Sequence, residues 1–149
     1  MPIIAPMKAG KSTIINGILG QKLLPTRNTA MTAIPTEIVF NIISTQESDG
    51  GSYLTLNKKF IDEIIRLQSS SHSYLQNHSD SLQMISSSYP HLFEVAQELH
   101  NVSASFRTLP EKTSGVKQIC ESLAFINDVI RLHENLPGNT NSGHEPFEL

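Results

Sequence analysis

The stretch that most constrains the fold lies near the start of the chain, where residues 5–13 read APMKAGKST. It matches the phosphate-binding pattern G-x-x-x-x-G-K-[ST] at Gly10, Lys11 and Ser12, but Ala5 stands at the first glycine position. Such a loop connects a strand to a helix, because its backbone N–H groups and the positive end of the helix must face the same phosphates. The stretch therefore predicts a strand, a loop and a helix in that order.

The residues around the loop support this order but leave an alternative open. Residues 2–4 (PII) resemble the end of a buried strand, and four apolar residues share one face of the helix expected over residues 10–19: Ile14, Ile15, Ile18 and Leu19. Gly20 is suited to end that helix. Against a phosphate loop, Pro6 removes one backbone N–H group. The alternative is that AGKST is simply a helix start that contains a lysine.

If the loop binds phosphate, each part of it has a chemical role. The lysine of the pattern neutralises the β- and γ-phosphates, and the hydroxyl that follows it ligates Mg²⁺. The predicted nucleotide-contacting residues are Ala5, Pro6, Met7, Lys8, Ala9, Gly10, Lys11, Ser12 and Thr13.

A threonine-rich loop, QKLLPTRNTAMTAIP, follows the predicted helix. In many phosphate-loop GTPases a threonine from such a loop closes over the γ-phosphate and completes the Mg²⁺ shell. Thr32 and Thr36 both fit by position, and Thr26 and Thr29 fit less well. The alternative is an ordinary polar connection, because threonine and proline are common in loops.

The rest of the chain divides into a short β part and a longer helical part. Residues 36–43 (TEIVFNII) and 53–57 (YLTLN) are predicted strands, and the turn residues ESDGGS between them favour a hairpin. A helix of about three turns is expected over residues 60–68, with Asn57 as its cap. Nine serines in residues 69–88 predict a loop or a weak helix.

Two further helices are expected towards the end of the chain. Pro90 opens the first, whose apolar positions run from Leu92 to Phe106. The segment TLPEKTSG interrupts the pattern. The second starts near Ser114 and ends at LPG (136–138), with apolar residues at alternating spacings of three and four.

Composition excludes several classes of function. The net charge of −3 gives no basic field for direct nucleic-acid binding. No apolar run approaches the roughly 20 residues of a membrane span. The single cysteine, Cys120, is expected to be a reduced, small core residue of a cytoplasmic protein. The six histidines show no metal-ligand spacing.

Three segments together carry a family resemblance: MKAGKST (7–13), LPTRN (24–28) and MTAIPT (31–36). At these spacings they resemble the GTPase domain of bacterial dynamin-like proteins, most of all its clamp-binding enterobacterial branch. The resemblance covers residues 3–40 and returns faintly at ICESLAFINDVIRLHENL, where that family has a helical insertion.

The resemblance implies GTP and Mg²⁺ as ligands and assigns roles by position. Lys11 would bind the β- and γ-phosphates, Ser12 and Thr32 would ligate Mg²⁺, and Thr32 would also hold the attacking water. Met7 and Lys8 lie in the segment that dynamins use to stabilise the transition state, where a lysine could meet developing negative charge. The candidate catalytic residues are thus Lys8, Lys11 and Thr32. The alternative for Lys8 is a solvated surface lysine.

The expected fold class is α/β: a partial phosphate-loop GTPase sheet, with a truncated first strand, a phosphate-loop helix and a β-hairpin, plus a helical insertion. Residues 1–57 would form the start of the GTPase domain, 58–136 the insertion, and 137–149 a polar tail or truncated end. The D-x-x-G and N-K-x-D motifs of the family do not occur. The chain is therefore expected to be an N-terminal fragment that binds GTP weakly or not at all and is inactive alone.

The resemblance also implies partners: a guanine nucleotide, a second copy across the GTPase domain, and, for the parent protein, a membrane or the DNA-replication machinery. A cytoplasmic or peripheral membrane location follows from it. Two other hypotheses remain open, a fragment of a phosphate-loop ATPase and a non-catalytic helical interaction module. The loop alone does not distinguish GTP from ATP, and the apolar stripes of the last two helices could pair with a partner instead of forming a core.

Overall fold

A computed structural model describes residues 10–24, 26, 51–103 and 105–137. Its elements follow in the order α1 (Lys11–Leu19), β1 (Tyr53–Thr55), α2 (Lys58–Asn77), α3 (Ser81–Ser88), η1 (Pro90–Leu92), α4 (Phe93–Asn101), β2 (Lys112–Ser114) and α5 (Val116–Asn135). The described part is thus a mixed structure of helices and one small antiparallel sheet. The predicted strands over 2–4 and 36–43, the hairpin and the tail from residue 138 lie outside the described residues.

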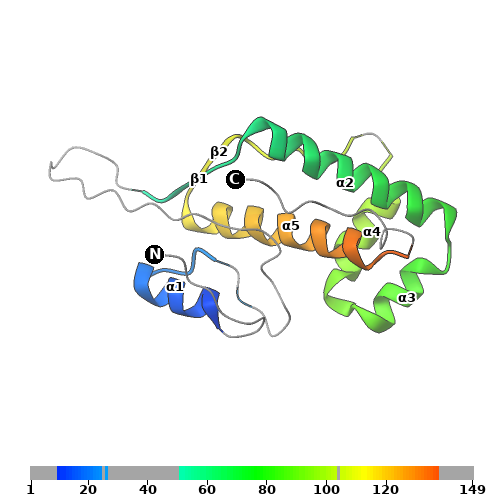
Figure 1. Ribbon diagram of the computed structural model, residues 1–149, viewed down its shortest axis with the longest axis horizontal. Helices are drawn as coiled ribbons and strands as arrows, with labels where there is room; N and C mark the ends of the chain where they lie inside the picture. The colour runs from blue at the N-terminus through cyan, green and yellow to red at the C-terminus, as the bar shows by residue number, and fades with distance from the viewer. Residues whose placement is uncertain (1–9, 25, 27–50, 104, 138–149) are drawn as a thin grey trace, which may run out of the picture.

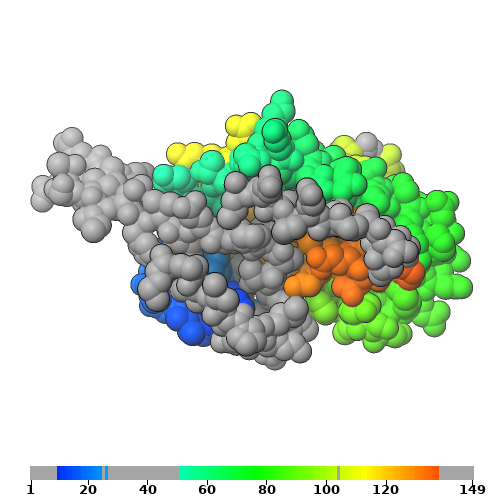
Figure 2. Space-filling view, viewed as in Figure 1, coloured from blue at the N-terminus to red at the C-terminus, as the bar shows by residue number. Residues whose placement is uncertain are grey.

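The two long helices, α2 and α5, form the centre of the fold. They lie side by side and run in the same direction, and α4 packs against both (Figure 1). In the space-filling view, the orange end of α5 lies directly against the green surface of the α2–α4 region (Figure 2). We call α2, α3, η1, α4 and α5 together the helical unit.

The core of the helical unit comes from apolar stripes at helical spacing. On α5 the stripe predicted from the sequence is buried at Ile119, Leu123, Ile126 and Ile130, with Ile126 fully inaccessible to solvent, and is half-buried at its first residue, Val116. On α2 the matching stripe contains Ile64 and Leu75, at 1% and 0% exposure. Burying such side chains contributes roughly 1.5–3 kcal/mol each. The stripes therefore form the protein's own core. They are not left exposed for a partner to cover.

The serine-rich stretch is helical, which corrects the expectation that α2 ends after about three turns. Helix α2 continues to Asn77, and α3 occupies most of the remaining stretch. Ser71 is fully buried, with its Oγ 3.4 Å from Nδ1 of His133 on α5. A serine thus occupies a core position on α2, which hides the continuation of the apolar stripe from the sequence pattern.

Helix α4 is shorter than predicted, because it ends at Asn101 instead of continuing to residue 106. Side chains of α2 bind the carbonyl groups at its end: His72 Nδ1 lies 2.7 Å from the Leu99 oxygen, and Gln76 Nε2 donates to the His100 oxygen. The chain then leaves the helix in an extended conformation at Val102. Pro90 opens a 3₁₀ turn before the helix, instead of the helix itself.

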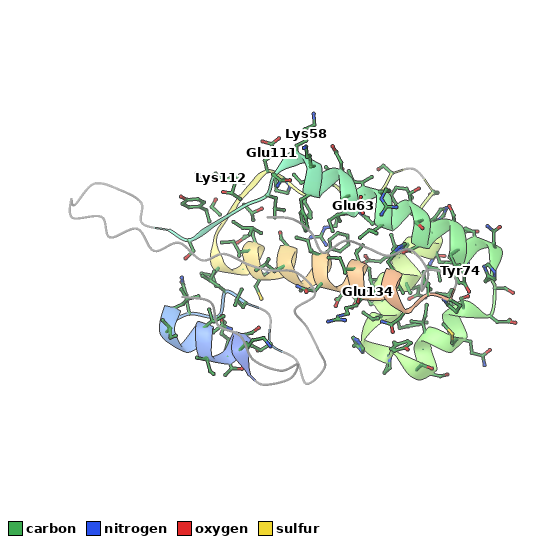
Figure 3. All side chains as sticks on the ribbon, in the orientation of Figure 1. Lys58, Glu63, Tyr74, Glu111, Lys112 and Glu134 are labelled. Carbon is green, nitrogen blue, oxygen red and sulfur yellow. The ribbon has the colours of Figure 1, made fainter. Side chains whose placement is uncertain are left out.

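The segment predicted as a break contains a strand. β2 pairs with β1 in antiparallel register, with Tyr53 opposite Ser114 and Thr55 opposite Lys112. The Lys112 ammonium lies 4.4 Å from the centre of the Tyr53 ring at the outer edge of this sheet (Figure 3). Because β1 directly precedes α2 and β2 directly precedes α5, the sheet joins the starts of the two long helices.

Cys120 is half-buried, so the expectation of a core residue was too strong. On the helix surface, the Glu63 carboxylate raises the pKa of the Arg66 guanidinium, mainly through their hydrogen bond. No helix in the described residues is both long and apolar enough to cross a lipid bilayer.

The predicted cap of α2 is confirmed, because Asn57 Oδ1 accepts a hydrogen bond from Phe60 N at 2.7 Å. We expect Asn57→Ala to lower the free energy of unfolding by about 1 kcal/mol, since one N–H group at the helix start loses its partner. Urea denaturation of the two proteins measures this difference. The matched control is Asn77→Ala at the exposed other end of α2, which should change stability by less than about 0.5 kcal/mol. Equal effects at the two ends would contradict the role of the cap.

Candidate phosphate-binding site

The predicted helix after the phosphate loop is present, and Gly10 shapes its start. Gly10 has φ 74° and ψ 18°, a left-handed conformation that residues with a side chain rarely adopt. Its carbonyl oxygen accepts the first helical hydrogen bond from Ile14 N at 3.0 Å. A Cβ added at Gly10 would meet open space, so a side chain would not clash there. Glycine is therefore needed for its backbone conformation. At the other end, Gly20 closes the helix with φ 67°, as predicted.

The first turn of α1 is arranged to receive an anion. The residue before it, Gly10, has no side chain to cap the helix, and no acidic residue lies in the turn. The partial positive charge of a helix N-terminus and its unpaired N–H groups attract phosphate. Lys11 adds a positive charge there, and Ser12 adds a hydroxyl; both side chains are half-buried. The helix start, the lysine and the hydroxyl thus belong to consecutive residues of one turn.

The structure brings together four of the predicted site residues, Gly10, Lys11, Ser12 and Thr13, within one turn of helix. The others lie outside the described residues: Ala5, Pro6, Met7, Lys8, Ala9 and Thr32. Convergence of Lys11, Ser12 and Thr32 on one ligand therefore stays a prediction.

The body of α1 differs from the expected amphipathic helix. Of the predicted apolar face, Ile14 and Ile18 are 56% and 65% exposed, while Ile15 and Leu19 are half-buried. The best-buried residue of the helix is instead polar: Asn16 is 8% exposed. Its side-chain amide bonds both backbone groups of Leu24, with Nδ2 donating to the Leu24 oxygen and Oδ1 accepting from Leu24 N, each at 2.8 Å.

Sequence reasoning missed Asn16, although the sequence holds a signal for it. Asparagine is a weak helix former, and here it interrupts the otherwise apolar run IINGIL. A polar residue in the middle of such a run suggests that its side chain has a specific hydrogen-bond partner.

A second hydrogen bond connects this region to the rest of the protein. Gln21 Nε2 donates to the Ser52 hydroxyl at 2.6 Å, and the Ser52 carbonyl accepts from Gly115 N at 3.3 Å. A shallow hollow lies between α1 and the segment after it, lined by Gly17, Gln21 and Lys22 among others. It runs along α1 from Thr13 in the first turn, past Asn16, to Gly20 after the helix.

The charged side chains labelled in Figure 3 lie apart from α1. Figure 3 labels Lys58, Glu63 and Glu134 on α2 and α5, and Glu111 beside the start of β2. Within the described residues, no three His, Cys, Asp or Glu side chains gather closely enough to hold a metal ion.

Comparison with known proteins gives a match that spans most of the chain. The sequence model of the dynamin family matches residues 3–126. Two curated relatives, both called clamp-binding protein CrfC, from Escherichia coli strain K12 and from Escherichia coli, are 58% identical over 38 residues. That alignment covers 26% of this chain but only 5% of each relative. No solved structure resembles the chain closely enough to count as a match. Because the family match includes α1 and most of the helical unit, the chain belongs to the dynamin family.

Proposed function

We propose that this chain forms the phosphate- and magnesium-binding part of a dynamin-like GTPase. The observation that carries the proposal is the start of α1, where left-handed Gly10 leads into a first turn that contains Lys11 and Ser12 and no acidic residue. Membership of the dynamin family supports guanine nucleotide as the ligand. A helix start without carboxylates suits a triphosphate, and a hydroxyl oxygen is a ligand that Mg²⁺ accepts.

The roles follow from the positions of the residues in the motif. Lys11 and the N–H groups of the first turn bind the β- and γ-phosphates. Ser12, together with Thr32, holds Mg²⁺, which when bound neutralises charge on the phosphates. Thr32 also orients the water that attacks the γ-phosphorus as its bond to the β-phosphate oxygen breaks. Lys8 meets the negative charge that develops in this step. Residues 5–13 line the site.

The proposal also divides the chain into three parts. Residues 1–57 belong to the GTPase domain, residues 58–136 form an insertion in it, and residues 137–149 form a tail. In a complete dynamin-like protein, we propose that a second copy docks across the nucleotide face. The relatives are named as clamp-binding proteins, and we propose a contact with such a clamp, or with a membrane, for the full-length protein.

The test is a titration of the full 149-residue chain with GTP and Mg²⁺, followed by NMR. We expect the backbone N–H signals of Lys11, Ser12 and Thr13 to move, with a dissociation constant of about 1 mM, which corresponds to only about 4 kcal/mol. Binding is weak because the chain has no N-K-x-D motif to recognise guanine. Lys11→Ala should weaken it at least about tenfold, since one charge-assisted contact is worth about 1.5–3 kcal/mol.

The matched control is Lys22→Ala, which removes the same charge from an exposed position after α1. It should change the dissociation constant less than about twofold, as expected for an exposed charge that makes no contact with the ligand. If Lys11→Ala and Lys22→Ala behave alike, the proposed site is wrong. Micromolar affinity with a preference for GTP over ATP would contradict the expectation that base recognition lies elsewhere. A helical interaction module would keep its function in Lys11→Ala.

A further inference from the structure

Within the described residues, helix α1 has no fully buried apolar side chain. It is nine residues long, and helices shorter than about 12–15 residues are marginal in water without tertiary contacts. Its apolar residues are incompletely buried, because Ile14 and Ile18 are largely exposed and Ile15 and Leu19 are half-buried. Gly17 in its middle weakens it further. The polar contacts of α1 with the neighbouring chain therefore matter for its stability.

Asn16 makes two of these contacts. Its amide pairs with both backbone groups of Leu24, eight residues later, at 2.8 Å in each direction. Two bonds from one planar group fix the orientation of Leu24 as well as its position. Both groups are partly buried, so the loss of Asn16 would leave a donor and an acceptor without partners. Asn16 thus fastens the segment after α1 back onto the helix.

Asn16 also lies on the same face of α1 as Ser12. Residues four apart on a helix are neighbours one turn from each other. The contact between Asn16 and Leu24 is therefore one helical turn from Ser12, whose hydroxyl belongs to the candidate phosphate-binding site. Any fraying of α1 at Asn16 would loosen the first turn, whose N–H groups must converge on the ligand.

We propose that Asn16 is a positioning residue of the candidate phosphate-binding site. It keeps α1 folded before a ligand arrives, so that the first turn is already arranged for an anion. This inference rests on the proposed function. When only a fraction of the molecules has the binding-competent helix, the apparent dissociation constant rises in inverse proportion to that fraction.

The first test is Asn16→Ala in the full chain. Alanine is a better helix former than asparagine, so a role limited to local helix propensity predicts slower amide exchange in α1 and tighter binding. A positioning role predicts the reverse. Setting two lost hydrogen bonds against the better propensity, we expect amide hydrogen exchange of Leu24 and of α1 to become about tenfold faster, and GTP–Mg²⁺ binding to become about tenfold weaker.

A rescue and a control sharpen the result. Gly17→Ala has free space for its methyl group and should favour the helix about fourfold to fivefold. Added to Asn16→Ala, it should restore part of the affinity, because it folds α1 without restoring the amide. The control is Gln97→Ala, which removes an exposed amide from α4 and should change neither measurement.

The outcomes separate this inference from the proposed function. Unchanged exchange at Leu24 and α1 in Asn16→Ala overturns the inference, whatever happens to binding. Faster exchange with unchanged GTP affinity also overturns it, because the contact would then not serve the site. If Lys11→Ala leaves the binding of GTP unaltered, or the wild-type chain binds none, the proposed function fails and the positioning role fails with it. Faster exchange in Asn16→Ala would then mark a purely structural contact.

Discussion

Replacing Ile126 with alanine is expected to lower the free energy of unfolding by about 3–4 kcal/mol. Ile126 lies in the middle of α5 and is fully buried, in the core that α5 shares with α2 and α4. The substitution removes the transfer energy of three carbon groups and leaves a cavity that the surrounding helices cannot fully close. Native domains are stable by only about 5–15 kcal/mol, so this loss is a large part of the total.

Urea denaturation followed by circular dichroism measures the effect, with Ile126→Val as an intermediate step expected to cost about 1 kcal/mol. The matched control is Ile18→Ala on α1, where the same side chain is 65% exposed and should change stability by less than about 0.5 kcal/mol. The slope against urea should stay the same, which shows that the change is in stability alone. A loss below about 1 kcal/mol for Ile126→Ala would contradict its place in the core.

Patterns that depend on nearby residues were predictable from the sequence. The stripe on α5, the Asn57 cap and the Gly20 end of α1 each involve residues within a few positions of one another. The same holds for the first turn of the candidate site, because Gly10, Lys11 and Ser12 are contiguous. Local spacing is enough to identify such features.

Features that depend on distant partners were not predictable. Ser71 is tolerated in the core because His133, 62 residues away, lies beside its hydroxyl. Helix α4 ends early where side chains of α2 bind its carbonyl groups, and β2 exists only because β1 offers an edge. Asn16 is a further example, because its contribution to stability depends on the hydrogen bonds with Leu24. In each case the partner lies far away or on another segment, and Ser71 and Asn16 are polar residues that looked out of place in their local patterns.

Gln68 is a further polar residue with a distant partner. Among the polar residues, its replacement is expected to lower the free energy of unfolding the most. It is 1% exposed on α2, and its amide pairs with both backbone groups of Arg107: Nε2 donates to the oxygen at 2.9 Å, and Oε1 accepts from N at 3.1 Å. This pairing holds the extended chain between α4 and β2 against α2. We expect Gln68→Leu to cost about 2–3 kcal/mol, because a side chain of similar volume leaves the two groups of Arg107 without partners.

The variant Gln68→Glu tests the same geometry through its dependence on pH. A neutral carboxyl can donate to the Arg107 oxygen and accept from its N–H, as the amide does, whereas the ionised form would place negative charge against that oxygen in a buried site. The pKa of the introduced carboxyl should therefore be higher in the folded than in the unfolded protein. Relative to wild type, the variant should be most stable below the unfolded pKa of about 4.3, and it should lose that stability as pH rises through the folded value.

Urea denaturation of wild type, Gln68→Leu and Gln68→Glu between pH 4 and pH 7 measures this. The difference between wild type and Gln68→Glu should grow with pH, while the difference for Gln68→Leu stays constant, since leucine does not titrate. Hydrogen exchange should show faster opening of the chain around Arg107 in both variants at pH 7. A pH-independent loss in Gln68→Glu would mean that the side chain reaches water in the folded state, because an exposed carboxyl keeps its ordinary pKa. The pairing with Arg107 would then not be what holds this segment on α2.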